Sequence, residues 1–343
     1  MQTILSPEDY IKGILQKDRI ILSKAITLIE STKKEDEAIA DAVLQACLKT
    51  KNTSKRIAIT GSPGAGKSTF INAFGKLLLD TQKSLAVLAI DPSSTISKGS
   101  ILGDKTRMED LVSNENCFIR PTASNNHLGG VGRTTRETIL LCEAFGFDYI
   151  FVETVGVGQS ETLVKNMTDL FMLLLLPNSG DELQGIKRGI MEMADIILIN
   201  KSDGENNVAA KIAATQVKHS LHLFSASEKE WITQVLNISS LEKTGLDTLQ
   251  KEIDSYFLKM ESTGFLKHNR NQQDLFWFEE TILQELQHLF SQNKTLDSIK
   301  IAIENAPNDT NKVNQYLKYI KQCYRTKNLT VDSLFHLKTL QKA

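Results

Sequence analysis

The 343-residue sequence has few cysteines, and they form no cluster. No C-x-x-C pair is present, and the four cysteines are widely separated, at Cys47, Cys117, Cys142 and Cys323. This spacing excludes a disulfide-stapled scaffold and a zinc site made of cysteine alone. It is typical of a protein from a reducing compartment, so we expect a cytoplasmic location.

Long apolar runs and an excess of charge of one sign are also missing. The longest apolar run, Leu170 to Leu176, is far shorter than the roughly 20 residues that a membrane-spanning helix needs. Met1 to Asp9 contain no Lys or Arg and precede no apolar segment, which argues against a signal peptide. Lys and Arg number 40 against 41 Asp and Glu, so no basic field attracts nucleic acid. We therefore expect neither a membrane nor a nucleic acid as partner.

Short apolar runs alternate with amphipathic segments between Arg56 and about Leu258. Near-continuous apolar strands separated by helices predict an α/β fold with a mostly parallel sheet covered by helices on both faces. The strands are expected at residues 56–60, 85–90, 117–120, 148–152, 170–176, 196–199 and 235–238.

Helical spacing of apolar residues predicts helices on both sides of this region. Two are expected before it, one running from the N-cap Ser6 through Ile29 and one from Glu35 to Leu48. After Met260, the spacing predicts three or four more helices. The sequence thus divides into an N-terminal helical segment (1–54), a central domain (55–260) and a C-terminal helical arm (261–343). The spacing alone leaves open whether the arm is a solvated extension or a dimerisation element.

One segment matches the phosphate-binding pattern G-x-x-x-x-G-K-[ST], and it lies directly between a predicted strand and a predicted helix. Glycines there let backbone N–H groups turn toward phosphates, and the helix N-terminus favours negative charge. Lys67 is expected to reach the β and γ phosphates, and Ser68 to offer its hydroxyl to Mg²⁺. The predicted phosphate-binding residues are Gly61, Ser62, Pro63, Gly64, Ala65, Gly66, Lys67, Ser68 and Thr69.

A second motif, Asn200-Lys201-Ser202-Asp203, ends the predicted strand 196–199 and matches the guanine-reading pattern N-K-x-D. The Asp203 carboxylate would accept from the ring N–H and the amino group of guanine, a pair that adenine does not offer. A backbone contact to the base is expected from Ser239, Ser240 and Leu241, because they follow the last predicted strand. Ser225 to Ser227 resemble more closely the S-A-x sequence that usually makes this contact, but they precede the last predicted strand instead of following it.

Three acidic residues are candidates for the γ-phosphate end of the site. Glu153 closes a predicted strand and precedes a glycine, where P-loop enzymes hold Mg²⁺ through water. Asp91 and Asp104 are also suited to the oxygen-rich coordination of Mg²⁺. Either of these two could instead be a helix N-cap.

With these motifs the sequence resembles the MeaB/ArgK family of P-loop GTPases, to which the human MMAA protein is related. The resemblance includes Glu153, since this family has Glu where other P-loop GTPases have Asp. Besides the motifs above, the matching stretches are 24–30, 89–94, 99–108, 129–131, 153–161 and 180–187.

The resemblance implies a GTPase chaperone that binds an adenosylcobalamin-dependent acyl-CoA mutase, usually methylmalonyl-CoA mutase, and controls cofactor loading and protection. It implies that GTP or GDP binds with Mg²⁺, which Ser68, Asp91, Asp104 and Glu153 surround. It also implies a homodimer formed through the C-terminal arm.

The resemblance further implies a switch at Asn178 to Arg188 that responds to the mutase. Within it, Gln184 and Lys187 would complete the hydrolytic site when the partner docks. We therefore expect low intrinsic turnover, with a catalytic set of Lys67, Asp91, Asp104, Glu153, Gln184 and Lys187.

Two other functions stay open at this point. One is an ATP- or GTP-dependent kinase of an amino-acid transport system, although the motif ending at Asp203 argues against ATP. The other is a metallochaperone GTPase, which should show clustered metal ligands, whereas the six histidines are scattered along the sequence.

Overall fold

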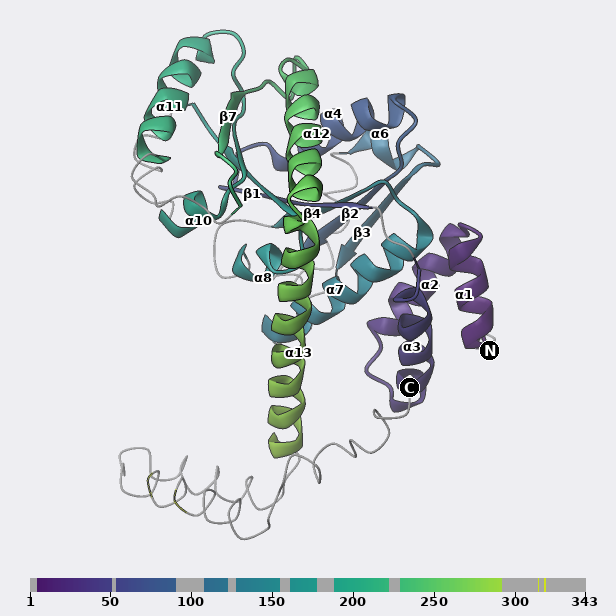
Figure 1. Cartoon of the computed structure of the whole chain (residues 1–343). Coiled ribbons are helices and arrows are strands. Elements are labelled where there is room, and N and C mark those ends of the chain that lie inside the picture. Colours follow the sequence, from purple (N-terminus) through teal and green to yellow (C-terminus); the bar gives the residue numbers. More distant parts are fainter. Residues whose placement is uncertain are drawn as a thin grey trace, which may run out of the picture. The chain divides into compact units, whose positions relative to one another are not determined.

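The computed structural model of the chain describes residues 5–50, 54–90, 108–122, 128–154, 161–177, 188–221 and 229–291, together with 314 and 318 (Figure 1). Its contacts divide the chain into two compact units, Met1–Phe278 and Glu279–Ala343. The first unit contains the sheet and the candidate site. The division of the sequence at residues 54 and 260 stays a prediction.

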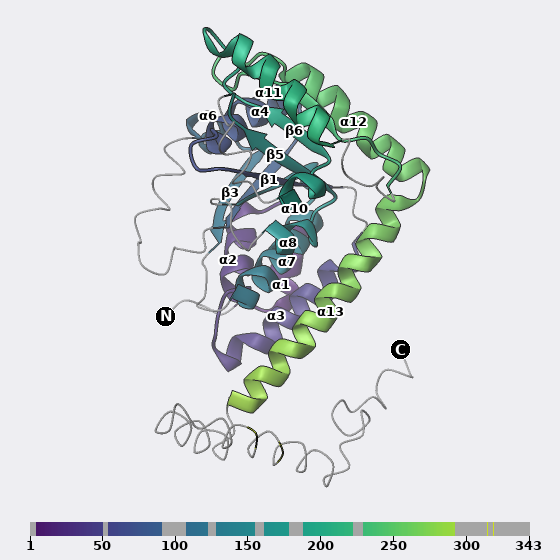
Figure 2. The ribbon, with the colours of Figure 1, turned by 90° about the vertical axis from the view of Figure 1, so that its left-hand side faces the viewer.

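In the described residues, seven strands form one parallel sheet in the order β3-β2-β4-β1-β5-β6-β7. Figure 1 labels β1 to β4 and β7, and Figure 2 labels β5 and β6. Each strand lies within two residues of its predicted limits, so the predicted fold class is confirmed. The strands are β1 (Lys55–Gly61), β2 (Leu85–Ile90), β3 (Cys117–Thr122), β4 (Tyr149–Thr154), β5 (Leu170–Leu175), β6 (Ile196–Ile199) and β7 (Gln234–Asn237).

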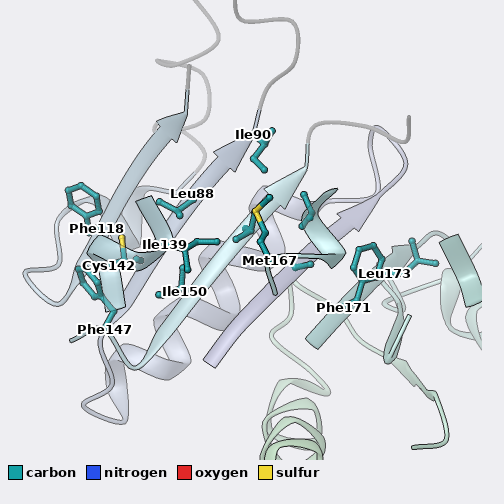
Figure 3. Packing of buried hydrophobic residues seen from close by; sticks show 14 of the residues in the cluster. Leu88, Ile90, Phe118, Ile139, Cys142, Phe147, Ile150, Met167, Phe171 and Leu173 are labelled. Atoms are coloured by element: carbon teal, nitrogen blue, oxygen red, sulfur yellow. The ribbon is translucent and has the colours of Figure 1, made fainter. Parts of the chain in front are cut away.

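Helices cover both faces of the sheet, and successive strand residues contribute to opposite faces. In β1, Ala58 joins one buried cluster, while Ile57 and Ile59 join the other. Figure 3 shows part of the first cluster, where Ile150 of β4 and Phe171 of β5 lie between the sheet and its helices. Full burial of each such side chain contributes about 1.5–3 kcal/mol.

The two clusters assign the helices to the two faces. On the first face lie α7 (Leu128–Phe145), α8 (Glu161–Lys165), α10 (Arg188–Met193) and α11 (Asn206–Leu221). On the second face lie α4 (Lys67–Asp80), α6 (Glu109–Val112) and α12 (Leu246–Ser262).

The N-terminal segment contains three helices in its described residues, so the prediction of two was wrong. They are α1 (Pro7–Leu15), α2 (Arg19–Ile29) and α3 (Lys34–Cys47). The predicted first helix breaks where Lys17 adopts a left-handed φ of 62° and Asp18 caps α2 by accepting from the N–H groups of Ile20 and Ile21. Apolar side chains of all three helices pack with α7 in the first cluster.

After α12 the chain turns at Gly264 and enters α13 (Phe265–Ser291), and Figure 2 shows the two helices following one another. Two side chains on the first half of α13 fasten it to the stretch between α8 and β5. Arg270 donates to both carboxylate oxygens of Asp169 at 2.8 and 2.7 Å, and Gln273 donates to Thr168 O at 2.7 Å. Within the part of the chain that the structure describes, no helix is long and apolar enough to cross a membrane.

Candidate nucleotide site

The phosphate-binding motif lies at the carboxyl edge of the sheet, between the end of β1 and the start of α4. β1 is a central strand, with β4 on one side and β5 on the other. Crevices at the carboxyl ends of parallel strands are where open α/β sheets bind ligands. The predicted strand–loop–helix context of this motif is therefore present.

The backbone of this loop needs glycine at two close approaches. Gly66 has a φ of 87°, which L side chains rarely adopt, and a Cβ there would lie 2.7 Å from Asn200 Nδ2. A Cβ on Gly61 would lie 2.5 Å from the carbonyl oxygen of Leu174. Because neither approach leaves room for a side chain, the loop conformation depends on these glycines.

The Lys67 ammonium closes the loop by donating to two of its carbonyls. The Lys67 Nζ atom lies 2.8 Å from Gly61 O and 3.2 Å from Ser62 O. Burial lowers the pKa of Lys67, and the charge of Glu153 opposes this shift. The positive charge of the motif is thus held against the loop backbone that would surround phosphates.

The structure brings together Ser68 and Glu153, which lie far apart in the sequence. Ser68, in the first turn of α4, donates its hydroxyl to Glu153 Oε1 at 3.1 Å, and Glu153 is buried near the end of β4. A hydroxyl and a carboxylate beside a phosphate-binding loop are the hard oxygen ligands that Mg²⁺ prefers. These two residues therefore fit the predicted metal.

The other predicted residues of the γ-phosphate end lie outside the described residues. These are Asp91, Asp104, Gln184 and Lys187, together with the segments 155–160 and 178–187. In the parts of the chain that are described, no group of three or more His, Cys, Asp or Glu is placed to hold a metal ion. The predicted metal ligands Ser68 and Glu153 are the two members of their set that the structure describes.

Asn200 connects the phosphate-binding loop with the loop after β7. Its amide nitrogen donates to Ala65 O at 2.8 Å, and its amide oxygen accepts from the Ser240 backbone and hydroxyl at 3.2 and 2.8 Å. The residue is only 1% exposed, so these bonds are shielded from water. One buried amide thus holds two predicted nucleotide-binding segments together.

Asp203 lies beside the same loop. Ser239 donates its hydroxyl to the Asp203 carboxylate, and its backbone forms two 3.1 Å hydrogen bonds with Thr244. Lys201 has a positive φ of 58°, and Leu241 is exposed. The loop 239–241 therefore lies next to the guanine-reading motif, whereas the alternative at 225–227 lies outside the described residues.

One feature beside the site was not predicted from the sequence. The hydroxyl groups of Thr60 and Thr154 form a hydrogen bond of 2.8 Å between the ends of β1 and β4, and both residues are fully buried. The sequence signal that could have pointed to these residues is a threonine near the end of each of two apolar strands. Their pairing depends on strand register, which motif matching does not supply.

The geometry is that of a nucleotide site, and comparison with known proteins is consistent with it. A model of the family described as "Methylmalonyl Co-A mutase-associated GTPase MeaB" matches residues 22–295. GTPase ArgK of Escherichia coli is 45% identical over 282 residues, which cover 82% of this chain and 85% of that protein. The mitochondrial methylmalonic aciduria type A homolog of Mus musculus is 43% identical over 298 residues, or 84% of this chain and 71% of that protein.

A similar structure has also been solved. The crystal structure described as an LAO/AO transport system kinase has a TM-score of 0.75 and 34% identity to this chain. The match covers 93% of this chain and 100% of the other. The α/β P-loop NTPase architecture therefore extends over most of the sequence.

Proposed function

The chain belongs to the MeaB family of GTPases, and from this premise we propose that it is a chaperone of an adenosylcobalamin-dependent acyl-CoA mutase. Methylmalonyl-CoA mutase is the first candidate, and GTP hydrolysis would gate the loading and protection of its cofactor. The observation that carries the proposal is the family match over residues 22–295. The mutase in the family's name supports the choice of partner.

The phosphates of GTP would lie in the loop from Gly61 to Thr69, with Lys67 leaving its carbonyl acceptors for phosphate oxygens. Ser68 and Glu153, with Asp91 and Asp104, would hold Mg²⁺. When bound, Mg²⁺ neutralises charge on the phosphates. The 3.1 Å contact between Ser68 and Glu153 supports this assignment because it places two oxygen ligands together beside the loop.

Guanine would be read by Asp203, with backbone N–H groups of Ser239 to Leu241 against the base. The bonds from Asn200 to Ala65 and Ser240 support this arrangement, since they hold the base-reading and phosphate-binding segments in one buried network. Lys67, Asp91, Asp104 and Glu153 would form the intrinsic catalytic set. Gln184 and Lys187 would act when the mutase docks, so we expect slow turnover that the partner raises.

The base assignment is tested by measuring the affinities for GDP, ADP and XDP, the xanthine analogue of GDP. Xanthine has a carbonyl where guanine has its amino group, and the amide of Asp203→Asn can donate to that carbonyl. This variant should therefore bind GDP more weakly and XDP more tightly than the wild type does. Asp203→Ala should lose the preference of the wild type for GDP over ADP, by about a hundredfold or more. Asp247→Ala, an exposed carboxylate in the first turn of α12, is the matched control and should behave as wild type. Equal hydrolysis of ATP and GTP by the wild type would refute the assignment.

The partner is tested by affinity capture from the native cell extract. The protein is loaded with a non-hydrolysable GTP analogue or with GDP, and Lys67→Ala serves as a control that should bind neither. Recovery of a cobalamin-dependent mutase in a nucleotide-dependent manner supports the proposal. Failure to recover any such mutase would contradict the chaperone role while leaving the GTPase activity in place.

We also propose that the chain forms a homodimer in the cytoplasm through the arm 261–343. Leu275 and Phe278, three residues apart on α13, are 57% and 63% exposed, which supports an interface on that helix. Sedimentation of the double variant L275E/F278E should show monomers. Leu258→Glu, at an exposed position of α12, should leave the dimer intact. A monomeric wild type would contradict this proposal.

The description of the similar crystal structure favours one second candidate, a kinase of a transport system. It predicts transfer of the γ-phosphate to a protein. Incubation of the cell extract with this protein and γ-labelled GTP or ATP distinguishes the two, because a GTPase releases label as inorganic phosphate. Label that appears on a protein only in the presence of the active chain would favour the kinase.

A further inference from the structure

The hydroxyl pair of Thr60 and Thr154 lies next to the proposed metal ligand Glu153, on the other face of the sheet. Thr154 donates to Thr60 at 2.8 Å, and both side chains are fully buried. The β1–β4 ladder pairs residues up to Ile59 and Glu153, so the two threonines are the next residues on their strands. The bond thus connects β1 and β4 one residue beyond their last ladder pair.

Each threonine is covalently next to a group that contacts the site. Thr60 precedes Gly61, whose carbonyl accepts from Lys67 Nζ, and Thr154 follows Glu153, whose carboxylate accepts from Ser68. Side chains alternate along a strand, so Glu153 faces α4 while Thr154 faces the opposite side of the sheet. The hydrogen bond between the two hydroxyls therefore restrains the backbone next to Glu153 from the opposite face of the sheet, and it does not involve the Glu153 carboxylate.

Sheet formation does not require these hydroxyls. Valine has the same shape as threonine, suits strands equally well, and would bury no polar atom. A buried hydroxyl that loses its partner is unfavourable, so the pair is tolerated only while both groups are present. Unlike a contact between two valines, a hydroxyl–hydroxyl bond is directional and restricts sliding of one strand end past the other.

We propose that Thr60 and Thr154 are positioning residues that fix the Glu153 carboxylate against Ser68 and thereby set the Mg²⁺ affinity of the nucleotide complex. The inference rests on the proposed function, in which Ser68 and Glu153 hold Mg²⁺. Neither threonine would touch the nucleotide or the metal. Their effect would come from the relative position of the two strand ends.

The test measures release of fluorescent GDP as a function of Mg²⁺ concentration and in excess chelator. The variants are T60V, T154V, the double variant T60V/T154V, and T154S, which keeps the hydroxyl. Either single valine variant should raise the Mg²⁺ concentration for half-maximal slowing of release by about tenfold, while release in chelator stays within about twofold of wild type. T154S should retain most of the wild-type response.

The double variant separates positioning from stability. It leaves no unpaired hydroxyl, so its melting temperature should recover relative to the single variants, but its Mg²⁺ response should stay weakened. T168V is the matched control, because the Thr168 hydroxyl is also buried and donates to Val164 O at 2.8 Å in another part of the unit. It should show the wild-type Mg²⁺ response.

Two results would overturn the inference. One is a wild-type Mg²⁺ response in both single variants, and the other is a response that recovers together with stability in the double variant. If GDP release from the wild type does not depend on Mg²⁺, the proposed metal role fails instead. Should a single valine variant not fold, T154S and the double variant decide the question.

Discussion

Trp277 packs closely against Gly132. We therefore predict that Gly132→Ala destabilises the wild type but not a variant in which Trp277 is replaced by phenylalanine. Trp277 of α13 is 2% exposed and donates its indole N–H to Asn166 O at 2.7 Å. A Cβ built on Gly132 of α7 would lie 2.5 Å from Trp277 Cη2 and 3.2 Å from Cζ3. Carbon atoms in good contact are about 3.5–4.0 Å apart, so alanine at position 132 must displace the ring.

Two opposing terms decide the effect of Gly132→Ala. Overpacking a buried site costs about 1–3 kcal/mol, whereas alanine is favoured over glycine inside a helix by about 1 kcal/mol. G132A should therefore lower the free energy of unfolding by about 1 kcal/mol in the wild type. W277F removes the outer ring and the indole hydrogen bond, which alone costs about 1 kcal/mol in addition to the lost packing. In the W277F background the obstruction is gone, so G132A should be neutral or stabilising by up to about 1 kcal/mol.

Urea unfolding followed by far-UV circular dichroism measures both effects, with the denaturant slope checked for constancy. Gly189→Ala in α10 is the matched control, since a Cβ there would meet no atom within 4 Å. It should shift the unfolding midpoint equally in both backgrounds. If G132A also shifts the midpoint equally in both, the close contact does not control stability and the reasoning is refuted.

Three further predictions concern the loop, a buried lysine and a buried thiol. Gly66→Ala should weaken GDP binding more than Gly64→Ala, because both glycines have positive φ but only the Cβ at position 66 would strike a neighbour, Asn200 Nδ2; competition binding measures this. Burial lowers the pKa of Lys165 to about 8 from an ordinary value of 10.5. The unfolded chain therefore holds this proton above pH 8 where the folded protein releases it, and stability should rise from pH 8 to 10.5 by about 2 kcal/mol more in the wild type than in K165M, as urea titrations would show. Burial raises the pKa of Cys117 to about 12, so mass spectrometry should find this thiol unmodified by a thiol reagent at pH 8 until the protein unfolds.

The strands could be predicted because each is a short apolar run buried on both faces. Their order in the sheet could not, since β4 lies between β2 and β1 although paired residues such as Lys55 of β1 and Tyr149 of β4 are 94 positions apart in the sequence. The break between α1 and α2 was missed because apolar residues continue at helical spacing across it. Only the left-handed backbone at Lys17 and the cap at Asp18 end one helix and start the next.

The nucleotide-binding motifs were evident in the sequence because their chemistry is local. A strand, a turn of glycines, a lysine and a helix start must follow one another directly, and Asn200 to Asp203 likewise form one continuous segment. The amino-acid order alone was therefore enough to indicate a P-loop GTPase and its family. Comparison with known proteins confirmed that assignment.

Contacts across the sheet required the tertiary structure. Ser68 meets Glu153, Thr60 meets Thr154, and Asn200 joins Ala65 to Ser240 through hydrogen bonds between residues 40 to 135 positions apart. Such contacts depend on the order of the strands and on their register. A shift of the register by one residue would move each side chain to the other face of the sheet. Local sequence determines which groups are available for chemistry, and only the packed sheet decides which of them meet.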